Sequence, residues 1–492
     1  MEPIGLEEVR VLDANSEHRG VPTLTLMENA GAGLVEHLLE LGAKGKRVLV
    51  LCGSGNNGGD GFVAARLLHG KAKVDIVLVR PADQVRTEIA RTSLERAELE
   101  GVPIHAPPAP YGELLARADI VVDALLGVGA EGAPRGAYAE AIKAINASGK
   151  RVVSVDVPSG WGTELAVRPE ATVTFHAPKE GMGAECGTVV VKPIGVPPDA
   201  VRLTGPGELL LVPPVRRDAH KRERGTVLVV GGGPYHGAPA LCALAAHRAG
   251  VDLSFVAVPG AVADVLRAHS LDLIVHGVGG RSAARFETAH LEELEGLWSG
   301  VDAVVLGPGM GAEPATLELA RAAYSSLVAG GRPVVVDADA LRALAGAERL
   351  PRGPSVVLTP HSGEYGRIAG SPLPPEGEGR HEAVRSVAFR LGCTMLVKAP
   401  LDVISDGVRV KLNDTGNAAM ATGGTGDVLA GVVGAFLAKR MRPFDAARAA
   451  AFLVGAAGDA ALAKVGHSML ATDVIAELPG VLGRYLPWWT RR

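Results

Sequence analysis

The chain has 492 residues, more than one hydrophobic core normally supports, so we expect two domains. Its 47% apolar content and 64 glycines fit an α/β protein with tight turns, and a formal net charge of −4 gives no electrostatic reason to expect a nucleic-acid partner. The N-terminus lacks the basic and apolar regions of a signal peptide and no apolar run reaches the length of a membrane span, so the sequence predicts a cytoplasmic protein without a membrane partner.

Short runs of Val, Ile and Leu alternate with helical stretches along the whole chain. This alternation predicts βα units and largely parallel sheets whose strands are buried on both faces. The predicted strands cover residues 47–51, 74–79, 120–123 and 152–157 in the first part, and residues 226–230, 253–258, 301–306, 334–337, 355–358 and 394–397 in the second. A hairpin signal at Asp406 and Gly407 predicts an antiparallel edge on the second sheet.

A stretch poor in predicted strands separates the two sets, from about residue 197 to residue 224, and contains five prolines. Linkers between compact units often have this composition. We therefore place the domain boundary near residue 205, which gives one domain over residues 1–204 and a second over residues 205–492.

In the first domain, a Gly-rich loop lies between the first predicted strand and a predicted helix over residues 62–68. Backbone N–H groups at such a helix N-terminus can hold a pyrophosphate. Gly53, Gly55 and Gly58 fit the GxGxxG pattern, so a Rossmann dehydrogenase is one alternative. The chain has no acidic residue where that fold binds ribose, about 20 residues on, although Arg80 in this region suits a 2′-phosphate.

Polar side chains gather at the predicted ends of the parallel strands: Asn57, Asp60, Asp123, Asp156 and Ser159. The carboxyl ends of parallel strands meet in one crevice, so these groups can share a site. Converging carboxylates repel one another unless a cation or a shared proton relieves them, and oxygen ligands favour a hard cation. The alternative is that each Asp only caps the turn that follows its strand.

Five motifs in this domain occur in the order found in NAD(P)H-hydrate epimerase, which residues 5–200 resemble. They are MENAG at 27–31, NNGGDG at 56–61, DALLGVG at 123–129, DVPSG at 156–160, and TVTF at 172–175 followed by Pro178 and Lys179. The resemblance implies a Rossmann-like fold that binds hydrated NAD(P)H and interconverts its R and S forms. It also implies K⁺ held by Asn57, Asp123 and Ser159.

The same resemblance implies the substrate contacts. These are Asn56, Asn57, Gly58, Gly59, Asp60, Gly127, Val128, Gly129, Ala130, Glu131, Gly132, Ala133 and Asp156. The hydrate is a hemiaminal, so Asp156 can act as general acid and base while water leaves and returns. The chain departs from the family at Trp161, Gly162 and Thr163, which replace an acidic stretch and leave a nicotinamide-nucleotide sensor with a degraded site as an alternative.

In the second domain, several polar and Gly-rich segments follow predicted strands and can line one cleft. They are residues 231–239, 307–311, 337–340 and 359–364. Each also has a plainer interpretation. His361 can be a loop histidine with local partners, Asp337 and Asp339 can cap a helix, and Lys398 can extend to solvent rather than contact a nucleotide.

The segment Gly423-Gly424-Thr425-Gly426-Asp427 leads directly into an apolar helix predicted over residues 428–437. Free N–H groups and the helix dipole favour phosphate there, and glycine leaves room for its oxygens. Asp427 repels phosphate unless it faces the other reactant, so its natural role is to accept a proton from a hydroxyl. The segment therefore indicates phosphoryl transfer, with an ordinary loop before a buried helix as the alternative.

In order and spacing, residues 215–485 resemble the ribokinase-like NAD(P)H-hydrate dehydratase. The resemblance implies that ADP phosphorylates the hydrate hydroxyl and that phosphate then leaves, with Mg²⁺ on the nucleotide phosphates. Asp427 is then the base and also contacts the hydrate, together with Ala238, Gly307, Gly309, Gly311 and His361. ADP is then held by Lys398, Ala399, Pro400, Leu401, Asp402, Asn417, Gly423, Gly424, Thr425 and Gly426.

Two positions depart from that family's pattern: Ala399 follows Lys398 where glycine is expected, and Ser362 stands where proline is expected. Neither change removes a catalytic group. The predicted fold class is α/β, with an N-terminal Rossmann-like parallel-sheet domain followed by a ribokinase-like α/β domain. Together the domains resemble the bifunctional repair enzyme, acting on the small molecule NAD(P)HX and assembling as a homo-oligomer. The remaining alternative is a ribokinase-like small-molecule kinase.

Overall fold

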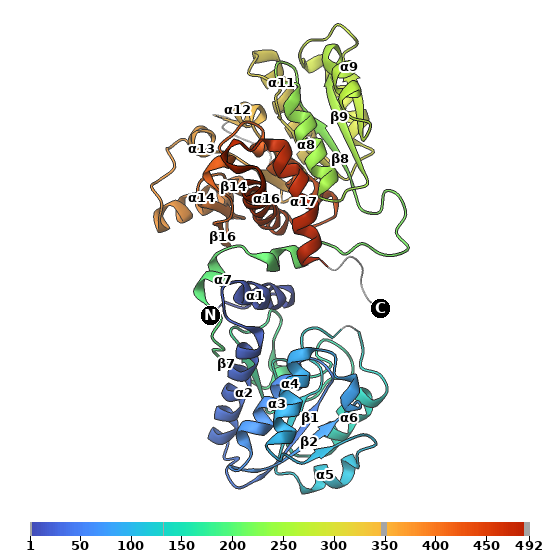
Figure 1. Cartoon of the computed structure of the whole chain (residues 1–492), viewed down its shortest axis with the longest axis vertical. Helices are drawn as coiled ribbons and strands as arrows, with labels where there is room; N and C mark the ends of the chain where they lie inside the picture. Colours follow the sequence, from blue (N-terminus) through green and yellow to red (C-terminus); the bar gives the residue numbers. More distant parts are fainter. Residues whose placement is uncertain (1, 131, 346–351, 487–492) are drawn as a thin grey trace. The chain divides into compact units, whose positions relative to one another are not determined.

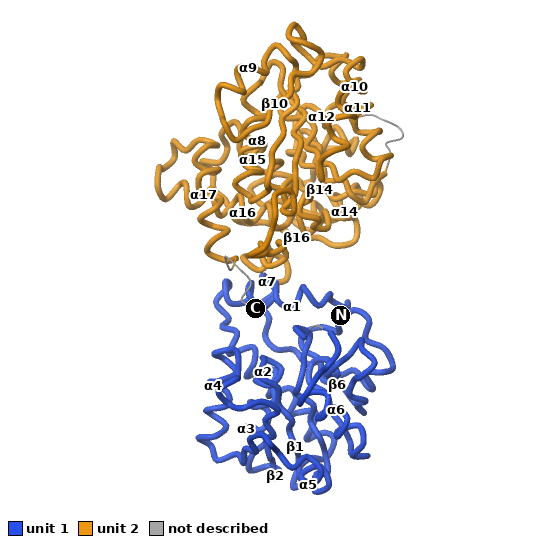
Figure 2. Tube along the Cα trace, turned by 90° about the vertical axis from the view of Figure 1, so that its right-hand side faces the viewer, with its two compact units in different colours: residues 1–200 blue, residues 201–492 orange. Residues whose placement is uncertain are grey.

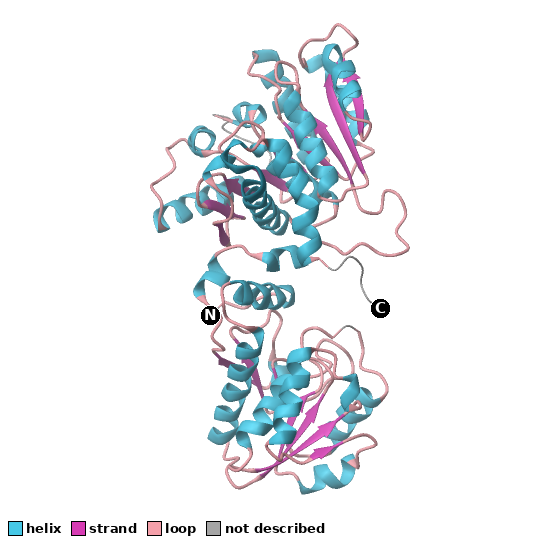
Figure 3. Ribbon diagram, viewed as in Figure 1, coloured by secondary structure: helices cyan, strands magenta, loops and turns pink. Residues whose placement is uncertain are grey.

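The computed structural model describes residues 2–130, 132–345 and 352–486. The chain divides into two compact units, residues 1–200 and 201–492 (Figure 2). Within each unit, helices cover both faces of one central sheet (Figure 3). This arrangement confirms the predicted α/β class.

The first unit contains a seven-stranded parallel sheet with the strand order β3-β2-β1-β4-β5-β6-β7. Its strands are β1 Arg47–Cys52, β2 Lys73–Leu78, β3 Ile104–His105, β4 Ile120–Ala124, β5 Arg151–Val155, β6 Ala171–Phe175 and β7 Thr188–Lys192. Its helices are α1 Leu6–His18, α2 Thr23–Glu40, α3 Asn56–Leu68, α4 Glu88–Leu99, α5 Tyr111–Arg117 and α6 Ala137–Ala147, before α7 Pro198–Arg202 (Figure 1). The order reverses between β1 and β4, which is where open α/β sheets bind ligands.

Strand β1 shows why the apolar runs of this unit form buried strands. Val48 and Val50 pack into the cluster made with α2, α3 and α4, while Leu49 and Leu51 pack into the cluster made with α5 and α6. Each fully buried side chain of this size contributes about 2 kcal/mol. Both faces are therefore apolar, and the strand reads as a continuous hydrophobic run.

The second unit contains a nine-stranded sheet with the order β10-β9-β8-β11-β12-β13-β14-β15-β16. Its strands are β8 Thr226–Val230, β9 Leu253–Pro259, β10 Leu273–Val278, β11 Ala303–Leu306, β12 Val334–Val336, β13 Val356–Leu358, β14 Thr394–Val397, β15 Asp402–Ser405 and β16 Val410–Asn413. The β14–β15 and β15–β16 pairs are antiparallel, which confirms the predicted hairpin edge.

Ten α-helices of the described residues cover this sheet. They are α8 Gly237–Arg248, α9 Gly260–His269, α10 Leu291–Trp298, α11 Pro314–Ala329, α12 Asp339–Leu344, α13 Ser362–Ala369, α14 Glu378–Leu391, α15 Thr425–Ala438, α16 Pro443–Val465 and α17 Ala471–Tyr485. Side chains of β8 alternate between the faces: Val227 and Val229 join the cluster with α8 and α15, while Leu228 and Val230 join the cluster with α11. The sheet is thus a buried middle layer.

Four strands lie outside the predicted set: β3, β6, β7 and β10. Strand β6 carries Thr172 and Thr174, which are buried and hydrogen-bonded, so its hydrophobic pattern is interrupted. Strand β3 has only two residues, too few for a pattern. Short or polar strands are recognised by their neighbours in the sheet, which the sequence does not display.

Helix α16 corrects one expectation about membranes. The segment Pro443–Ser468 is long and apolar enough, by length and composition alone, to cross a bilayer, although 56% of its apolar window is buried inside the structure. Its first turns carry Asp445 and Arg448, both buried and joined by a 2.9 Å ion pair. Arg448 also lies 3.6 Å from Glu208, in the short helix η3 Pro206–Leu211. The helix is packed as a core element of the second unit.

Candidate active sites

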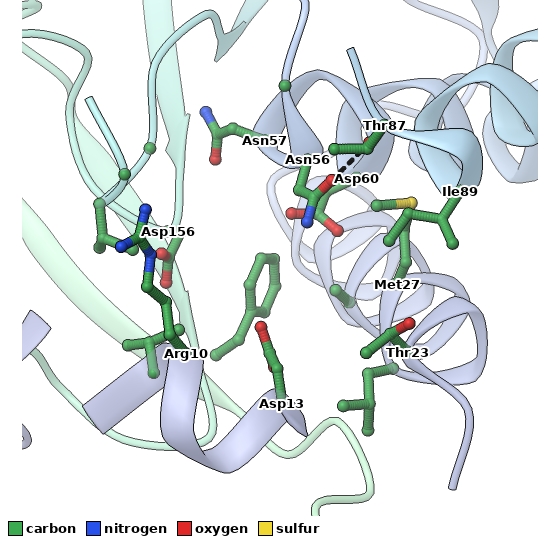
Figure 4. Close-up of a pocket in the computed structure, with 18 of the residues that line it drawn as sticks. Arg10, Asp13, Thr23, Met27, Asn56, Asn57, Asp60, Thr87, Ile89 and Asp156 are labelled. Atoms are coloured by element: carbon green, nitrogen blue, oxygen red, sulfur yellow. Dashed lines mark hydrogen bonds between the residues drawn. The ribbon is translucent and has the colours of Figure 1, made fainter. Parts of the chain in front are cut away.

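A cavity of about 370 Å³ opens in the first unit at the N-terminus of α3 and the carboxyl ends of the strands (Figure 4). The sharp turn from β1 into α3 places polar side chains at its wall. The predicted substrate-binding residues that line the cavity are Asn56, Asn57, Asp60, Gly127, Val128, Gly129, Ala130 and Asp156. These come from the first turns of α3, the loop after β4 and the residue after β5, as the parallel topology requires.

The other predicted substrate contacts of this unit are not in the cavity wall. Gly58 and Gly59 serve close packing, because a Cβ at Gly58 would lie 2.1 Å from the Gly53 oxygen and one at Gly59 would lie 2.5 Å from a methionine methyl group. Gly132 and Ala133 are exposed on the following loop. Glu131 lies outside the described residues.

Asp156 sits on the cavity wall in a backbone conformation that side chains rarely adopt, with φ of 63°. Such strain persists only where the surroundings hold it, and it is common at functional sites. One Asp156 oxygen lies 2.7 Å from Nζ of Lys179 and accepts a hydrogen bond from Thr174. Lys179 is buried and also donates to the Phe175 and Ala177 carbonyls, so its position is tightly defined.

Lys179 closes the last of the five motifs of this domain, but no pattern in the sequence indicates a role for it. Residues 156 and 179 belong to different strand ends, and only the β5–β6 pairing brings them together. The sequence feature that could have indicated Lys179 is its position shortly after a strand, in a domain with several carboxylates at its strand ends.

Asp60 completes the set of predicted acids at this cavity. Burial, then the negative charges of Asp156 and Asp13, raise the pKa of Asp60 well above its ordinary value. This favours the neutral carboxylic acid, which can donate a hydrogen bond.

The predicted K⁺ ligands also lie close together. Buried Asp123 accepts hydrogen bonds from the hydroxyl of Ser159 at 2.5 Å and from its backbone N–H at 2.9 Å. Ser159 Oγ lies 3.2 Å from the Leu126 carbonyl oxygen, and a Cβ on the adjacent Gly127 would lie 3.1 Å from Asn57 Oδ1. Burial raises the pKa of Asp123, and the hydrogen bonds from Ser159 oppose that rise.

This donor set suits a weakly charged hard cation. It offers one carboxylate and several neutral oxygens, whereas the described residues contain no group of three or more His, Cys, Asp or Glu side chains arranged to hold a metal. The residues therefore fit the predicted K⁺ ion.

Trp161, the residue that departs from the family pattern, lies outside the cavity wall. Its indole N–H donates to Glu185 at 3.0 Å, and its ring lies against Gly181. It lines a separate surface pocket with residues 162–169. The departure therefore leaves the surroundings of Asp156 intact.

In the second unit, Asp427 stands in the first turn of α15, where N–H groups are free of helical partners. Gly424 caps this helix with φ of 98°, and Thr425 donates its hydroxyl to the Met420 and Thr422 carbonyls. Burial, then the charge of Asp337, raises the pKa of Asp427 to about 7, against the influence of Lys398. A carboxylate with this pKa can accept a proton near neutral pH.

Lys398 lies at the same helix end. A Cβ on Gly426 would lie 3.3 Å from Nζ of Lys398, so the ammonium faces the Gly-rich turn. Nζ also makes a 2.7 Å ion pair with the buried Asp337. The structure thus brings together the predicted anion hole, the predicted base and a lysine able to meet a phosphate.

The predicted hydrate-binding glycines follow β11 and adopt positive φ angles. A Cβ on Gly307 would lie 1.9 Å from the Asp337 carbonyl oxygen, and one on Gly309 would lie 2.1 Å from the Tyr235 oxygen and 3.1 Å from Ala238. Gly311 donates its N–H to Asp339 at 2.8 Å. These contacts place the loops after β8, β11 and β12 side by side.

His361 caps helix α13, and its Nδ1 accepts hydrogen bonds from the N–H groups of Gly363 and Glu364. The plainer interpretation of a locally satisfied histidine therefore holds for this nitrogen. The side chain is 56% exposed, and residue 361 forms a β-bridge with Lys398. His361 is thus next to the lysine of the anion site, and its Nε2 lies 3.4 Å from Glu364 on its own helix.

The segment predicted to hold ADP is built by local hydrogen bonds. Asp402 accepts from the Ala399 N–H and from the Asn413 amide, which folds the turn of residues 398–402 that also contains Pro400 and Leu401. Asn417 caps a short helix and donates to Asp459, which also accepts from the Gly416 N–H. No sequence pattern indicates Asp459, because it lies on α16, far along the chain from Asn417. Gly423 is exposed beside this segment.

Comparison with known proteins assigns both units. Residues 227–480 match the family model described as NAD(P)H-hydrate dehydratase, and residues 23–181 match the one described as YjeF-related protein N-terminus. The bifunctional NAD(P)H-hydrate repair enzyme Nnr of Pyrobaculum aerophilum is 44% identical, over 99% of this chain and 99% of that protein.

Solved structures match the second unit. The ADP/ATP-dependent NAD(P)H-hydrate dehydratase of Bacillus subtilis, co-crystallised with ATP and Mg²⁺, is 26% identical with a TM-score of 0.50, over 58% of this chain and 98% of that one. A ribokinase-like superfamily protein of Enterococcus faecalis, 24% identical with a TM-score of 0.51 over 58% and 96%, shows the same fold. The chain therefore belongs to the family of bifunctional NAD(P)H-hydrate repair enzymes.

Proposed function

We propose that this protein repairs hydrated NAD(P)H by two activities on one chain. Residues 1–204 interconvert the R and S forms of NAD(P)HX, and residues 205–492 dehydrate the S form at the expense of ADP, giving NAD(P)H, AMP and phosphate. The observation that carries the proposal is Asp427 in the first turn of α15, beside the Gly-rich turn and Lys398, on a chain that matches a bifunctional relative over its full length.

The dehydratase step follows from the chemistry of the leaving group. Hydroxide leaves poorly and phosphate leaves well, so transfer of a phosphoryl group to the hydrate hydroxyl prepares the elimination. Asp427 accepts the hydroxyl proton, the N–H groups of residues 423–426 stabilise the transferred group, and Lys398 contributes a positive charge. Mg²⁺, present with ATP in the Bacillus relative, neutralises charge on the nucleotide phosphates.

The epimerase step needs water to leave one face of a ring carbon and to return to the other. The hydrate is a hemiaminal, so the ring nitrogen can supply the electrons that expel water. Asp156 lines the cavity and is held by Lys179, which suits it to proton transfer. K⁺ held by Asn57, Asp123 and Ser159 would fix the loop after β4 and orient the substrate.

Two other functions make different demands. A small-molecule kinase would keep its phosphorylated product and would leave the first unit without a role. A sensor with a degraded epimerase site would bind without turnover, although Trp161 lies outside the cavity wall and removes no group from it. Neither alternative has a specific structural observation in its favour.

One assay separates the three functions. Purified protein is incubated with both NADHX epimers, ADP and Mg²⁺, and the absorbance of regenerated NADH is followed. We expect recovery of both epimers. Recovery of the S epimer alone would indicate an inactive first unit, and recovery of neither would support a kinase or a sensor. Replacing ADP by ATP tests the nucleotide preference.

We further infer a homo-oligomer, because of the family resemblance, and a cytoplasmic location, because of the features of the sequence described above. Sedimentation of the purified chain tests the oligomeric state. Fractionation of cells that produce the chain tests the location, and recovery of the protein with membranes would contradict it.

A further inference from the structure

The epimerase cavity contains one carboxylate that neither the sequence motifs nor the family comparison assigns. Asp13 lies on α1 and lines the cavity together with Asp60 and Asp156. Figure 4 shows the three carboxylates approaching from three different elements: α1, the first turns of α3 and the end of β5. Unpartnered Asn57 Nδ2, buried in the wall of the same cavity, indicates that a ligand completes the site.

Inversion at a ring carbon requires proton transfer on both of its faces. Departing water must receive a proton on one side, and returning water must lose a proton on the other. One carboxylate cannot reach both faces of a bound ring, so a group on a different wall has to assist Asp156.

The groups on the Asp156 wall do not meet this need. Lys179 is committed to Asp156 and to carbonyl groups, and His176 belongs to the same segment, directly after β6. A group from another element has to serve the second face, and the carboxylates of the cavity that come from other elements are Asp13 on α1 and Asp60 on α3.

The environments of these two acids differ. The pKa of Asp60 is raised well above its ordinary value, by burial and then by Asp156 and Asp13, which favours a permanent neutral donor. Burial, then the charge of Asp156, raises the pKa of Asp13 to about 6, with Lys179 opposing the rise. A group with this value can both release and regain a proton near neutral pH.

We propose that Asp13 is the second catalytic acid–base group of the epimerase and acts on the ring face opposite Asp156. This proposal rests on the epimerase activity proposed above. In one direction, protonated Asp13 gives its proton to the ring hydroxyl, the C–O bond breaks as the nitrogen lone pair forms a C=N⁺ bond, and water leaves. Water then adds to the other face, the C=N⁺ electrons return to nitrogen, and the Asp156 carboxylate takes the released proton. The reverse reaction exchanges the two roles.

The test uses the full chain and one purified NADHX epimer without ADP, so that the dehydratase is idle. Epimer exchange is followed by chromatography after subtraction of the enzyme-free rate. Asp13→Asn is expected to lower kcat for exchange by about 100-fold or more, since this is the usual contribution of general acid–base catalysis. Glu17→Gln is the matched control, because Glu17 is an exposed acid on the same helix, and it is expected to keep the wild-type rate.

The pH profile separates a catalytic role from a structural one. The other charged or titratable groups that face this cavity are Arg10, Asp60, Arg86, Tyr138, Asp156, His176 and Lys179. Exchange from the epimer whose hydroxyl faces Asp13 is expected to slow as pH rises through about 6 in the wild type. The residual rate of Asp13→Asn is expected to lack this step, and Asp13→Glu is expected to restore it.

Three outcomes would overturn the proposal. The first is a wild-type exchange rate in Asp13→Asn, and the second is a change confined to KM. The third is loss of exchange in Asp60→Asn with Asp13→Asn unaffected, which would assign the second face to Asp60. Hydrogen-exchange protection of the backbone amides of the first unit serves as the folding control for every variant, because NADH formation reports only on the second unit. A wild-type chain that exchanges no epimers would overturn the epimerase activity itself.

Discussion

Each unit has a lysine close to aspartates of its proposed active site, but the lysine forms its ion pair with the proposed catalytic aspartate only in the first unit. In the first unit, Lys179 Nζ lies 2.7 Å from the proposed catalytic Asp156. In the second, Lys398 Nζ lies 2.7 Å from Asp337, and the proposed base Asp427 is left without that ion pair. Burial and Asp337 then raise the pKa of Asp427 to about 7. The choice of partner for the lysine therefore decides whether the neighbouring catalytic carboxylate has its charge compensated.

The largest effect on activity is expected from replacing Asp427, the proposed base that has no ion pair with Lys398. Asp427→Asn keeps the shape of the side chain but cannot accept a proton, so we expect NADH formation to fall by about 1,000-fold. Epimer exchange measured on the same sample is the control and is expected to persist. Unchanged NADH formation would show that Asp427 is not the base.

The reciprocal change in the first unit tests whether the activities are separate. Asp156→Ala is expected to lower epimer exchange by about 100-fold, because it removes a proton-transfer group from the cavity. Chromatography of the epimers measures the loss, while NADH formation from the S epimer is expected to stay near the wild-type rate. Equal loss of both activities would mean that the substitution disturbs more than its own site.

The ion pair between Lys179 and Asp156 is also expected to stabilise the first unit. Lys179→Met leaves a carboxylate in the cavity wall without its cation, so we expect the free energy of unfolding of the first unit to fall by about 3 kcal/mol. Hydrogen exchange of the backbone amides of the first unit, measured at increasing urea concentration, reports this free energy. Arg151→Met is the matched control: it breaks an exposed ion pair with Glu170 and is expected to cost less than about 1 kcal/mol. An equal loss of stability in Lys179→Met and Arg151→Met would contradict the expected difference between the buried and the exposed ion pair.

The pH dependence sharpens the contrast for Asp427. The base must be ionised, so kcat/KM for dehydration is expected to rise about tenfold per pH unit below pH 7 and to level off above it. The stability effect has the opposite sign, since the folded pKa lies above the ordinary 3.8: this group's contribution is complete below about pH 4 and is lost as pH rises through about 7. Thermal unfolding of Asp427→Asn from pH 4 to 8 is expected to lack that loss.

The smallest effect is expected at the residue that departs from the family pattern. Trp161→Ala removes one partly exposed hydrogen bond to Glu185, which is worth about 1 kcal/mol. Epimer exchange is expected to change by less than about threefold, which corresponds to under 1 kcal/mol. A large loss would bring back the interpretation of a degraded site.

Much of the fold follows from local patterns. Strands such as β1 and β8 are buried on both faces, so their hydrophobic runs are continuous and were predicted, whereas β6 has buried threonines and was missed. The Gly-rich turn before α15 was predicted for the same reason: its residue types and its position before an apolar helix are adjacent in the chain.

Which charged side chains form ion pairs at the two sites cannot be predicted from the sequence. Lys398 has both Asp337 and Asp427 within its electrostatic reach, and only the positions of β12 and β14 in the sheet decide which one it contacts. Asp13 reaches the cavity because α1 packs over it, although no motif surrounds it. Such contacts depend on distances of a few ångströms between elements that are remote in sequence.

Helix α16 has nearly the apolar composition of a membrane-spanning helix, but it carries two charged residues near its start, Asp445 and Arg448. A residue such as Asp or Arg costs about 3 kcal/mol at the centre of a membrane-spanning helix, and less near the end, where Asp445 and Arg448 lie. In water the same two side chains pair with each other, and Arg448 approaches Glu208 on η3. A lipid-embedded α16 would lose these contacts with η3, so the same two charged residues that hold η3 on α16 also disfavour insertion of this helix into a bilayer.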